Sequence, residues 1–538
     1  MEHSKEINNP FYRTGILPIF LVFPLAFLIR LIHLISYTSY PPFDLPLGGN
    51  AAYVKAALKI VDGDILGGKE IFYDNSPIYS YMLAGIFKIF GIDFFAVRFL
   101  QIILGSLNCC LVATISRYHF GTRAALISGF MASIYGPFIF YDAEIIVLPW
   151  VIFFCLTSIV LIMKDMQSIA KSWLAGLCVG AAIMGRPNLI LFPVLLFLYF
   201  TFGKDKLNLA FRCRSYIWFL IGVMVIPGIF VARNYVVSGE IVFLNPSGGH
   251  NFYFGHHKGA SPVFDERSKF IGSIYLKYKE KAEEDMKRPL SPGEVSIYWY
   301  KKGLKFIVHN PLEELKLILE KILFFFNDVE IPTYFNYYFN KDYSAVLKHW
   351  VLTFGIVFPL SAIGFVATLE RCRELMILYI FFLSSLLTVL IFFVISRLRI
   401  PGVPVIIMFA GAGCSYTITW CKNKALKPIV LTGLVLVPLY WFTFTPLVRL
   451  SYAEPHNHLG VVYWYKGRIP EAEREFLAAL RLKPDFEYPL LNLVKMFRLE
   501  GNKEKEELYR SWLNNWRQRD RQEKLVKKKT TDGIKASR

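Results

Sequence analysis

Residues 123–163 read RAALISGFMASIYGPFIFYDAEIIVLPWVIFFCLTSIVLIM, two apolar runs on either side of Asp142 and Glu144. A helix needs about 20 apolar residues to cross a hydrocarbon core of roughly 30 Å, and the runs 123–139 and 147–163 approach that length. Ionisable residues at a membrane edge cost several kcal/mol unless they face a cavity or a partner, so this acidic pair marks a candidate site. The alternative interpretation is a loop in water that carries both carboxylates.

Apolar runs of this kind recur along most of the chain. Hydrophobic residues account for 54% of the 538 and the mean hydropathy is +0.41, which excludes an ordinary soluble domain. We therefore predict an all-α polytopic membrane protein with about 11 transmembrane helices. The predicted spans are 15–35, 96–117, 123–139, 147–163, 173–185, 188–203, 216–236, 349–368, 375–395, 402–419 and 428–447. The first is interpreted as a retained anchor, because its apolar run is long and no small-residue cleavage site follows it.

Basic residues concentrate in the short connections on one side of these spans. Lysine and arginine favour the cytoplasmic side, so we expect the amino terminus to lie inside and the long segments 36–95, 237–347 and 449–538 to lie outside. The formal net charge of +19 combines this loop bias with a basic tail at 517–538, which suits contact with anionic lipid or polymer better than nucleic acid. None of the eight cysteines lies in an outer segment, so no disulfide framework is expected there.

The chain changes character after residue 448. The residues that follow have the spacing of a tetratricopeptide repeat at Leu459, Gly460, Tyr463, Gly467, Ala472, Phe476, Ala479 and Pro484. One period of about 34 residues later, Glu506 and Arg510 stand where alanine and phenylalanine belong, so the second repeat is degenerate. We predict a membrane domain at 1–448, a helical repeat domain at 449–515 that binds a protein partner, and a basic flexible tail at 516–538. The alternative is a helical hairpin retained only for folding.

The outer segments contain two amphipathic stretches and a group of histidines. Pro77–Gly91 has a helical period but is too short to cross the membrane, which predicts an interfacial helix. Pro311–Phe326 repeats leucine and isoleucine at helical spacing, and we expect that face to be packed. His250, His256 and His257 are of the metal-binding type, yet no cysteine or ordered carboxylate completes a site, so no metal or other cofactor is expected.

A series of short motifs runs in order along residues 1–448. They are Tyr53–Ala57 with Ile60–Asp64, Pro77–Tyr79, Ala96–Arg98, Tyr135–Pro137 before the acidic pair, Gly185–Asn188, Gly248–Tyr253, Pro289–Pro292 with Tyr298–Trp299, and Arg397–Pro401. In this order, and with the repeat appended, the chain resembles the GT-C membrane glycosyltransferases of the protein-mannosyltransferase and aminoarabinose-transferase type. The likeness is strongest to bacterial members that carry carboxy-terminal tetratricopeptide repeats.

The resemblance implies transfer of a sugar, with inversion at the anomeric carbon, from a polyprenyl phosphate donor to a glycan, lipid or protein acceptor at the outer face. A carboxylate must take the acceptor's proton, and Asp142 and Glu144 are candidates. Cations must stabilise the leaving phosphate, a task for which the guanidinium groups of Arg397 and Arg399 are suited. Arg186, between two short spans, is placed to face the same cavity. The alternative is that these arginines extend to water or anchor the chain at the interface.

The chain departs from the family pattern at one important position. The family's expected catalytic base is an aspartate four residues before the tyrosine equivalent to Tyr53, and here that position is Gly49, followed by Asn50. Neither residue can accept a proton at neutral pH. Asp44, five residues earlier, is a candidate substitute. The alternative function is therefore a non-catalytic relative that binds lipid-linked sugar or recruits an enzyme through its repeats; a transporter is less favoured, because no inverted repeat of the spans is apparent.

Overall fold

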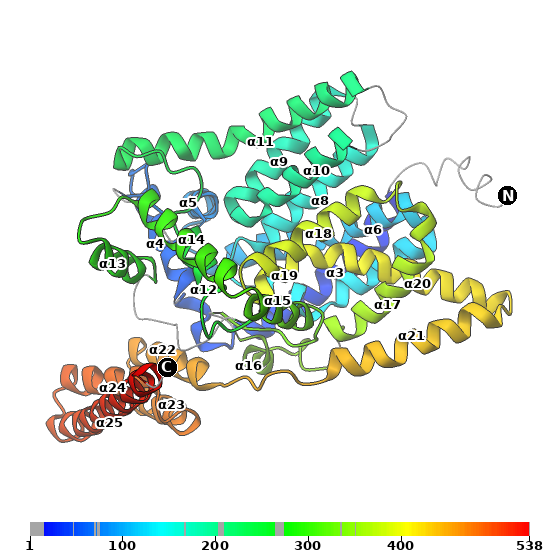
Figure 1. Cartoon of the computed structure of the whole chain (residues 1–538). Coiled ribbons are helices and arrows are strands. Elements are labelled where there is room, and N and C mark those ends of the chain that lie inside the picture. The colour runs from blue at the N-terminus through cyan, green and yellow to red at the C-terminus, as the bar shows by residue number, and fades with distance from the viewer. Residues whose placement is uncertain are drawn as a thin grey trace. The chain divides into compact units, whose positions relative to one another are not determined.

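The computed structural model describes residues 16–46, 48–68, 71–72, 76–165, 168–202, 209–263, 274–333, 336–349 and 351–536. Over these residues the regular structure is helical, with two isolated β-bridges and no strand, which confirms the predicted all-α fold (Figure 1). The chain forms two compact units. Unit 1 comprises residues 1–37, 48–337 and 341–448, and unit 2 comprises residues 38–47, 338–340 and 449–538.

The apolar helices of unit 1 correspond to the predicted spans. They are α3 (Ile16–Tyr37), α6 (Phe94–Ile134), α8 (Leu148–Asp165), α9 (Ile169–Gly185), α10 (Leu191–Phe202), α11 (Leu209–Ser238), α17 (Phe354–Ala367), α18 (Met376–Ile391), α20 (Val403–Lys422) and α21 (Leu426–Phe444). Five described helical segments are long and apolar enough to cross a membrane, and shorter apolar helices accompany them. The chain is therefore a multi-pass membrane protein, as predicted.

The predicted span 96–117 and the first part of the span 123–139 fall within α6, on either side of Gly121. This residue has φ 85°, a conformation that glycine adopts at little cost and that ends one helix before the next begins. The second helix stops at Ile134, and the short α7 (Gly136–Asp142) follows with Pro137 in its first turn. Proline suits that position because the first N–H groups of a helix have no internal partner. The break thus places the acidic pair at the end of α7 and just beyond it.

Small residues allow the spans to approach closely. A Cβ atom on Gly176 of α9 would lie 1.9 Å from the carbonyl oxygen of Phe219 in α11, and one on Gly222 would lie 2.2 Å from that of Trp173. Such contacts are the usual means by which membrane helices pack without a hydrophobic driving force between them. Helix α6 packs similarly against α3 and α20, so its middle lies inside unit 1.

Shorter elements connect the spans. They are η1 (Pro41–Asp44), α4 (Gly49–Val61), α5 (Pro77–Phe90), η2 (Pro187–Ile190), α12 (Gly248–Phe254), α13 (Ile274–Met286), α14 (Pro292–His309), α15 (Pro311–Phe325), α16 (Tyr337–Asn340), η4 (Lys341–Tyr343), η5 (Leu369–Arg371), α19 (Ser396–Arg399) and η6 (Ile400–Gly402). The predicted interfacial helix is α5, which packs on α4 and α9 and leaves Ile89 and Phe90 exposed. Helix α14 begins with a capping box between Ser291 and Glu294, which satisfies two N–H groups of its first turn.

The predicted packing of α15 is wrong. The leucines expected inside are exposed, from 81% at Leu312 to 46% at Leu323, whereas the buried face carries Glu314 and Lys321. The physical reason is that these polar groups have partners. Glu314 lies 2.9 Å from His256, and the ammonium of Lys321 donates to the carbonyl oxygens of Gly255 and Leu390. Buried polar groups with partners are tolerated, so the hydrophobic period alone identified the wrong face.

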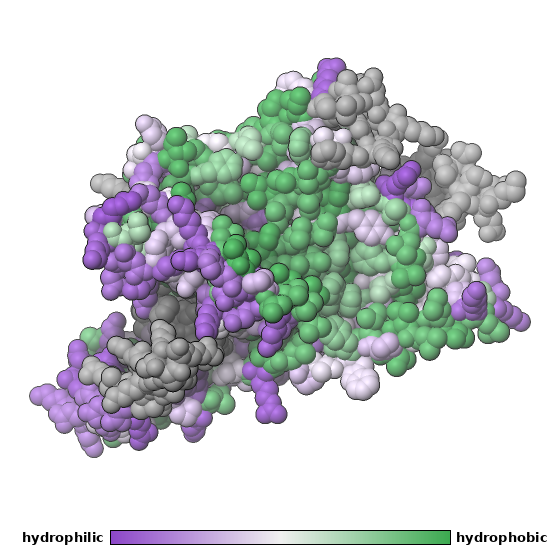
Figure 2. Space-filling view, in the orientation of Figure 1, coloured by the Kyte–Doolittle hydropathy of each residue, from purple (hydrophilic) through white to green (hydrophobic). Residues whose placement is uncertain are grey.

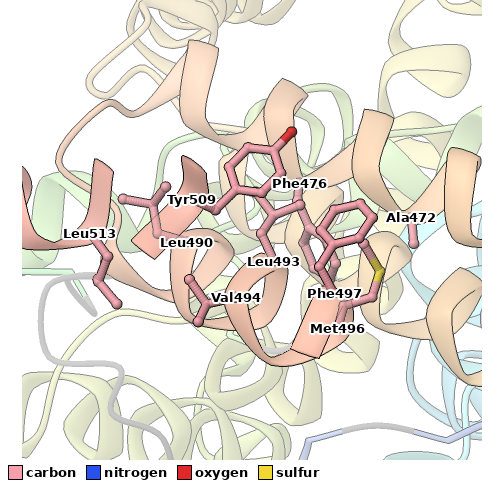
Figure 3. Close-up of a cluster of buried hydrophobic side chains, with 9 residues drawn as sticks. All are labelled: Ala472, Phe476, Leu490, Leu493, Val494, Met496, Phe497, Tyr509 and Leu513. Atoms are coloured by element: carbon pink, nitrogen blue, oxygen red, sulfur yellow. The ribbon is translucent and has the colours of Figure 1, made fainter. Parts of the chain in front are cut away.

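Unit 2 contains α22 (Ala453–Tyr465), α23 (Ile469–Leu482), α24 (Glu487–Leu499) and α25 (Lys503–Ala536). Each packs on the next, and Phe476, Leu493 and Phe497 lie in their common core (Figure 3). In the degenerate second repeat, Tyr509 and Leu513 fill the core, while Glu506 instead accepts hydrogen bonds from Arg498 and Arg510.

The backbone of α25 continues as a helix through 516–536, where a flexible tail was predicted. The segment is rich in lysine and arginine, which are good helix formers.

Candidate functional site

The acidic pair lies inside unit 1. Asp142 and Glu144 are each 3% exposed, which excludes the interpretation of a loop in water. Asp142 closes α7 and Glu144 follows in the turn before α8. Carboxylates so enclosed require specific partners, and the structure provides a different one for each.

The partner of Asp142 is Arg30 of α3. The Arg30 Nε atom lies 2.7 Å from Asp142 Oδ2, and both side chains are almost completely buried. The Nη1 atom of the same guanidinium donates to the carbonyl oxygens of Ala26 and Ser133. On the other side of the carboxylate stands Gly105 of α6, where a Cβ atom would lie 2.0 Å from Asp142 Oδ2. Asp142 is therefore neutralised and sterically confined.

The carboxylate of Glu144 accepts a hydrogen bond from the hydroxyl of Tyr37, with 2.5 Å between the two oxygens. The backbone around it is also fixed, because the amide of Gln101 donates to the carbonyl oxygens of Asp142 and Glu144 and Arg98 donates to that of Ala143. A hydroxyl can rotate away or exchange its acceptor, unlike a buried ion pair. Glu144 is thus better suited than Asp142 to take up a proton.

Two of the three predicted arginines lie in one electrostatic neighbourhood. Arg186 stands between α9 and η2 and is half-buried. Its Nε and Nη2 atoms are shielded from solvent and have no hydrogen-bond partner among the described residues. Arg186 lies near enough to Arg397 of α19, to Tyr53 and to Tyr141 for their charges to influence one another. Because Tyr141 precedes Asp142, both guanidinium groups lie near the acidic segment, and two guanidinium groups have the chemistry that binding an anion requires.

The third arginine, Arg399, has another role. It is 1% exposed, and its Nη1 atom donates to the carbonyl oxygens of Phe325 and Asn327. Its Nη2 atom donates to the carboxylate of Glu330 at 2.7 Å, and the guanidinium lies over the ring of Phe354. Both terminal nitrogen atoms are therefore occupied, and Arg399 anchors the segment after α15.

The residues around Gly49, where the resemblance would place an aspartate, are divided between the units. Gly49 is the first residue of α4 in unit 1, and the next residue, Asn50, is 4% exposed. Asp44 ends η1, belongs to unit 2 and is exposed. General base catalysis favours a half-buried carboxylate, and Asp44 is not enclosed in this way.

The three histidines considered as metal ligands face different partners. His256 contacts Glu314 and the carbonyl oxygen of Ile391. His250 stacks on Tyr278 with 4.9 Å between the ring centroids, and His257 bonds the carbonyl oxygen of Lys258. Within the described residues, no three histidine, cysteine, aspartate or glutamate side chains are grouped to hold a metal.

Sequence reasoning missed Arg30 and Glu330. Arg30 could have been found, because it is an arginine within an apolar span and such a residue usually has a partner inside the protein. Glu330 gave no comparable signal, since it lies in a polar segment where a glutamate is ordinary.

The acidic segment lies in a part of the chain that matches the profile of a known protein family. The profile of the dolichyl-phosphate-mannose-protein mannosyltransferase family matches residues 74–230. This range contains the acidic pair and Arg186, and it confirms over that part of the chain the resemblance to membrane glycosyltransferases of GT-C type. A search of curated proteins gave no match.

The chain is also similar to solved structures, among them those of AglB and ArnT. An archaeal oligosaccharyltransferase, AglB from Archaeoglobus fulgidus in complex with an inhibitory peptide and a dolichol-phosphate, aligns at 13% identity and a TM-score of 0.41, over 86% of this chain and 60% of AglB. ArnT from Cupriavidus metallidurans, bound to undecaprenyl phosphate, aligns at 13% identity and a TM-score of 0.32, over 76% of this chain and 79% of ArnT. The chain thus spans about 60% of the length of AglB.

Proposed function

We propose that this chain transfers a sugar from a polyprenyl-phosphate-linked donor to an acceptor at the outer face of a bacterial inner membrane, with inversion at the anomeric carbon. The observation that carries the proposal is the pairing of Arg186 and Arg397 beside the segment Tyr141–Glu144. Two buried N–H groups of Arg186 are available for an anion, and a carboxylate that can accept a proton lies a few residues from Tyr141. An inverting transferase requires these two functions close together.

In the proposed reaction an oxygen of the acceptor attacks the anomeric carbon from the side opposite the phosphate. The new C–O bond forms as the bond to the phosphate oxygen breaks, so the bonding pair leaves with polyprenyl phosphate. The acceptor's proton passes to the carboxylate of Glu144. Asp142 is assigned to position Glu144 through the rigid segment they share, because its own carboxylate is neutralised by Arg30.

The leaving phosphate gains negative charge as the bond breaks, and the arginines are assigned to stabilise it. Arg186 offers Nε and Nη2, which are adjacent donors of one planar guanidinium and match two phosphate oxygens. Arg397 adds a second positive charge. Arg399 is assigned to position Arg397, which lies in the same short helix α19. Its own N–H groups donate hydrogen bonds to the segment 325–330 and so fix that helix.

A non-catalytic function is the second candidate, because Gly49 occupies the position of the family's expected base. In that case the arginine pair would bind lipid-linked sugar without turnover. The helices of unit 2, whose first hairpin has tetratricopeptide spacing, would then recruit a partner protein. The outer location of both candidates rests on the basic residues in the short loops of the opposite side.

The test is release of free polyprenyl phosphate from lipid-linked sugars in proteoliposomes. We expect turnover by the wild type and a loss of about 100-fold or more for Glu144→Gln, while Glu370→Gln, at an exposed position in η5, leaves the rate unchanged. Loss in Asp44→Asn with Glu144→Gln unaffected would assign the base to Asp44. No turnover until Gly49→Asp is introduced would establish the non-catalytic function.

A further inference from the structure

A pocket of about 400 Å³ lies between the end of α12 and the last two turns of α14. Three lysines, two histidines, two aromatic rings and an asparagine line it, and no carboxylate of the described residues does. Figure 2 shows hydrophilic side chains gathered over α13 and α14, in contrast to the hydrophobic side chains over the spans. Small-molecule sites occupy about 300–1,000 Å³, so the pocket has the size and the charge to hold a small anion.

The two helices that form the pocket are locked together by glycines. A Cβ atom on Gly249 of α12 would lie 2.0 Å from the carbonyl oxygen of Ser296, and one on Gly303 of α14 would lie 2.7 Å from a ring of α12. The ring of Tyr253, in the wall of the pocket, packs against the buried Trp299 with 4.6 Å between the ring centroids. The wall is therefore formed in advance of any ligand, as in most small-molecule sites.

Two lysines of the pocket have no anionic partner. Lys258 and Lys305 are exposed and form no ion pair with any residue in the described part of the chain. The neighbouring Lys302, in contrast, is paired with Asp285 at 2.8 Å and lies over the ring of Tyr298. A phosphate or carboxylate in the pocket would supply the missing counter-charge through charge-assisted hydrogen bonds.

The other polar groups of the pocket are left with hydrogen-bond acceptors. The Nδ1 atom of His309 lies 2.7 Å from a carbonyl oxygen of its own helix, and that of His257 lies 2.9 Å from the carbonyl oxygen of Lys258. Because a carbonyl oxygen only accepts, each Nδ1 atom carries the hydrogen, and the Nε2 atom of the neutral ring accepts. The amide nitrogen of Asn310 likewise donates to a carbonyl oxygen of α14. Hydroxyl groups of a ligand suit these acceptors.

The lining thus describes its ligand, which needs a negative charge, several hydroxyl groups and an apolar face for the rings of Tyr253 and Phe306. Inorganic phosphate has the charge but no apolar face, and a neutral sugar has the hydroxyl groups but no charge. A sugar with a phosphate or carboxylate group combines all three features, because the C–H groups of a sugar ring pack on aromatic rings.

We propose that this pocket binds an anionic sugar, with its charged group at Lys258 and Lys305 and its ring against Phe306. The pocket shares no residue with the proposed anion site at Arg186 and Arg397, so it is available while the donor is bound. The sugar then belongs to the acceptor, which is an anionic glycan. This assignment to the acceptor rests on the proposed function, whereas the binding itself does not.

The binding test is isothermal titration calorimetry of the full-length protein in detergent micelles, with glucose 6-phosphate, glucuronate and the neutral glucose as probes. We expect the charged probes to bind about ten-fold or more tighter than glucose. Lys258→Gln/Lys305→Gln should remove this advantage, while Lys301→Gln/Lys316→Gln, at exposed positions outside the pocket, should keep it. Absence of binding by both charged probes, or an advantage that survives in the pocket variant, would overturn the proposal.

A second variant separates a sugar from other sources of the same charge. Phe306→Leu removes the ring and should weaken glucose 6-phosphate by about three-fold or more, while the weaker binding of inorganic phosphate stays unchanged. Inorganic phosphate that binds the wild type as tightly as glucose 6-phosphate would show a site for any small anion. Displacement of glucose 6-phosphate by a soluble short-chain phosphatidylglycerol would assign the pocket to a lipid headgroup. Either result would overturn the assignment to a sugar.

The acceptor assignment is tested in the assay for release of polyprenyl phosphate. Glucose 6-phosphate or glucuronate should increase release by the wild type, and neither should do so in Lys258→Gln/Lys305→Gln. Binding of these probes by a chain without turnover would contradict the proposed function and leave the sugar site intact. Turnover that neither probe changes would contradict the acceptor assignment and leave the proposed function intact.

Discussion

Arg30 and Asp142, 112 positions apart in the sequence, form a 2.7 Å ion pair that is almost fully removed from solvent. The pair connects the first span to the end of α7 and so fixes the segment that presents Glu144. Burying either charge alone inside a membrane domain would cost free energy of folding, and the ion pair reduces this cost for both residues. The same contact explains why a short helix with an acidic end is stable between two apolar spans.

We predict that breaking this pair from one side is strongly destabilising. Arg30→Met leaves the carboxylate of Asp142 buried without a counter-charge, and a loss of about 3 to 5 kcal/mol is expected. The double variant Arg30→Met/Asp142→Leu should lose clearly less than the sum of the single changes, because no charge remains unpaired. The measurement is thermal unfolding in detergent micelles, with the exposed Arg123→Gln as control. Additive losses would contradict a coupled pair.

The close contact between Gly105 and Asp142 leads to a second prediction. Gly105→Ala should destabilise the protein by about 1 to 3 kcal/mol, since the added Cβ atom would overlap the carboxylate and displace it from Arg30. Gly85→Ala in α5 is the matched control, because its Cβ atom would meet no described atom within 4 Å. The control should be neutral or slightly stabilising, as alanine favours a helix. Equal midpoints of unfolding for the two variants would show that the space around Asp142 adjusts.

The spans were predictable from the sequence because length and hydropathy determine them locally. The pair Arg30–Asp142 was not, although both charges are visible in apolar surroundings, because the partner of a charge depends on which helices become neighbours. Helix α15 shows the opposite error. Its leucines predicted a packed face, but the partners available to Glu314 and Lys321 decided which side turned inward. Hydrophobic periodicity identifies an apolar face and does not say whether protein or lipid covers it.

The proposed anion site was predictable in part. The arginines stood in motifs that the family resemblance identified, and Arg186 and Arg397 do share a neighbourhood. The different environment of Arg399 could be recognised only from its partners in the structure. These are the carbonyl groups of Phe325 and Asn327 and the carboxylate of Glu330, which lie about 70 residues away in the sequence. Long-range backbone contacts of this kind leave no local pattern.

A third prediction concerns pH. Burial lowers the pKa of His250, in the outer segment, to about 4, from an ordinary value of about 6.5. The unfolded chain therefore takes up a proton below about pH 6.5, whereas the folded chain does so only near pH 4. This contribution to stability is fully present above about pH 6.5 and falls as the pH falls, by roughly 3 kcal/mol at most.

The pH effect is measured from the unfolding midpoint between about pH 7 and pH 5. His250→Phe keeps the ring that stacks on Tyr278 but cannot titrate, so its midpoint should fall less over this range than that of the wild type. His349→Gln, at an exposed position, should behave as the wild type does. Parallel curves for the wild type and His250→Phe would assign the acid sensitivity to other groups.

The helical unit at the carboxy terminus gives a fourth prediction. Phe476 is fully buried, and a Cβ atom on Gly460 would lie 2.6 Å from its ring. Phe476→Ala should therefore cost about 3 to 5 kcal/mol through the cavity it leaves, whereas Leu482→Ala, at an exposed position in the same helix, should cost little. Limited proteolysis of the full chain measures this loss of stability within unit 2. Equal cleavage within 453–515 in both variants would contradict a core centred on Phe476.

The final prediction separates the roles of Arg186 and Arg399. Arg186→Gln should weaken binding of polyprenyl phosphate by about ten-fold to a hundred-fold, as expected for lost hydrogen bonds to a charged group, and should leave the unfolding midpoint near that of the wild type. Arg399→Gln should instead lower the stability by about 3 to 5 kcal/mol, because Glu330 then remains buried without its partner.

Binding of polyprenyl phosphate, followed by the shift it produces in the unfolding midpoint, tests these roles even if turnover is absent. Arg186→Lys keeps the charge but not the planar fork, so its affinity should fall between those of the wild type and Arg186→Gln. If Arg399→Gln keeps its stability and loses the ligand shift, the two roles are reversed. The phosphate would then bind at the segment 325–330, and the two enclosed nitrogen atoms of Arg186 would need another anion to explain them.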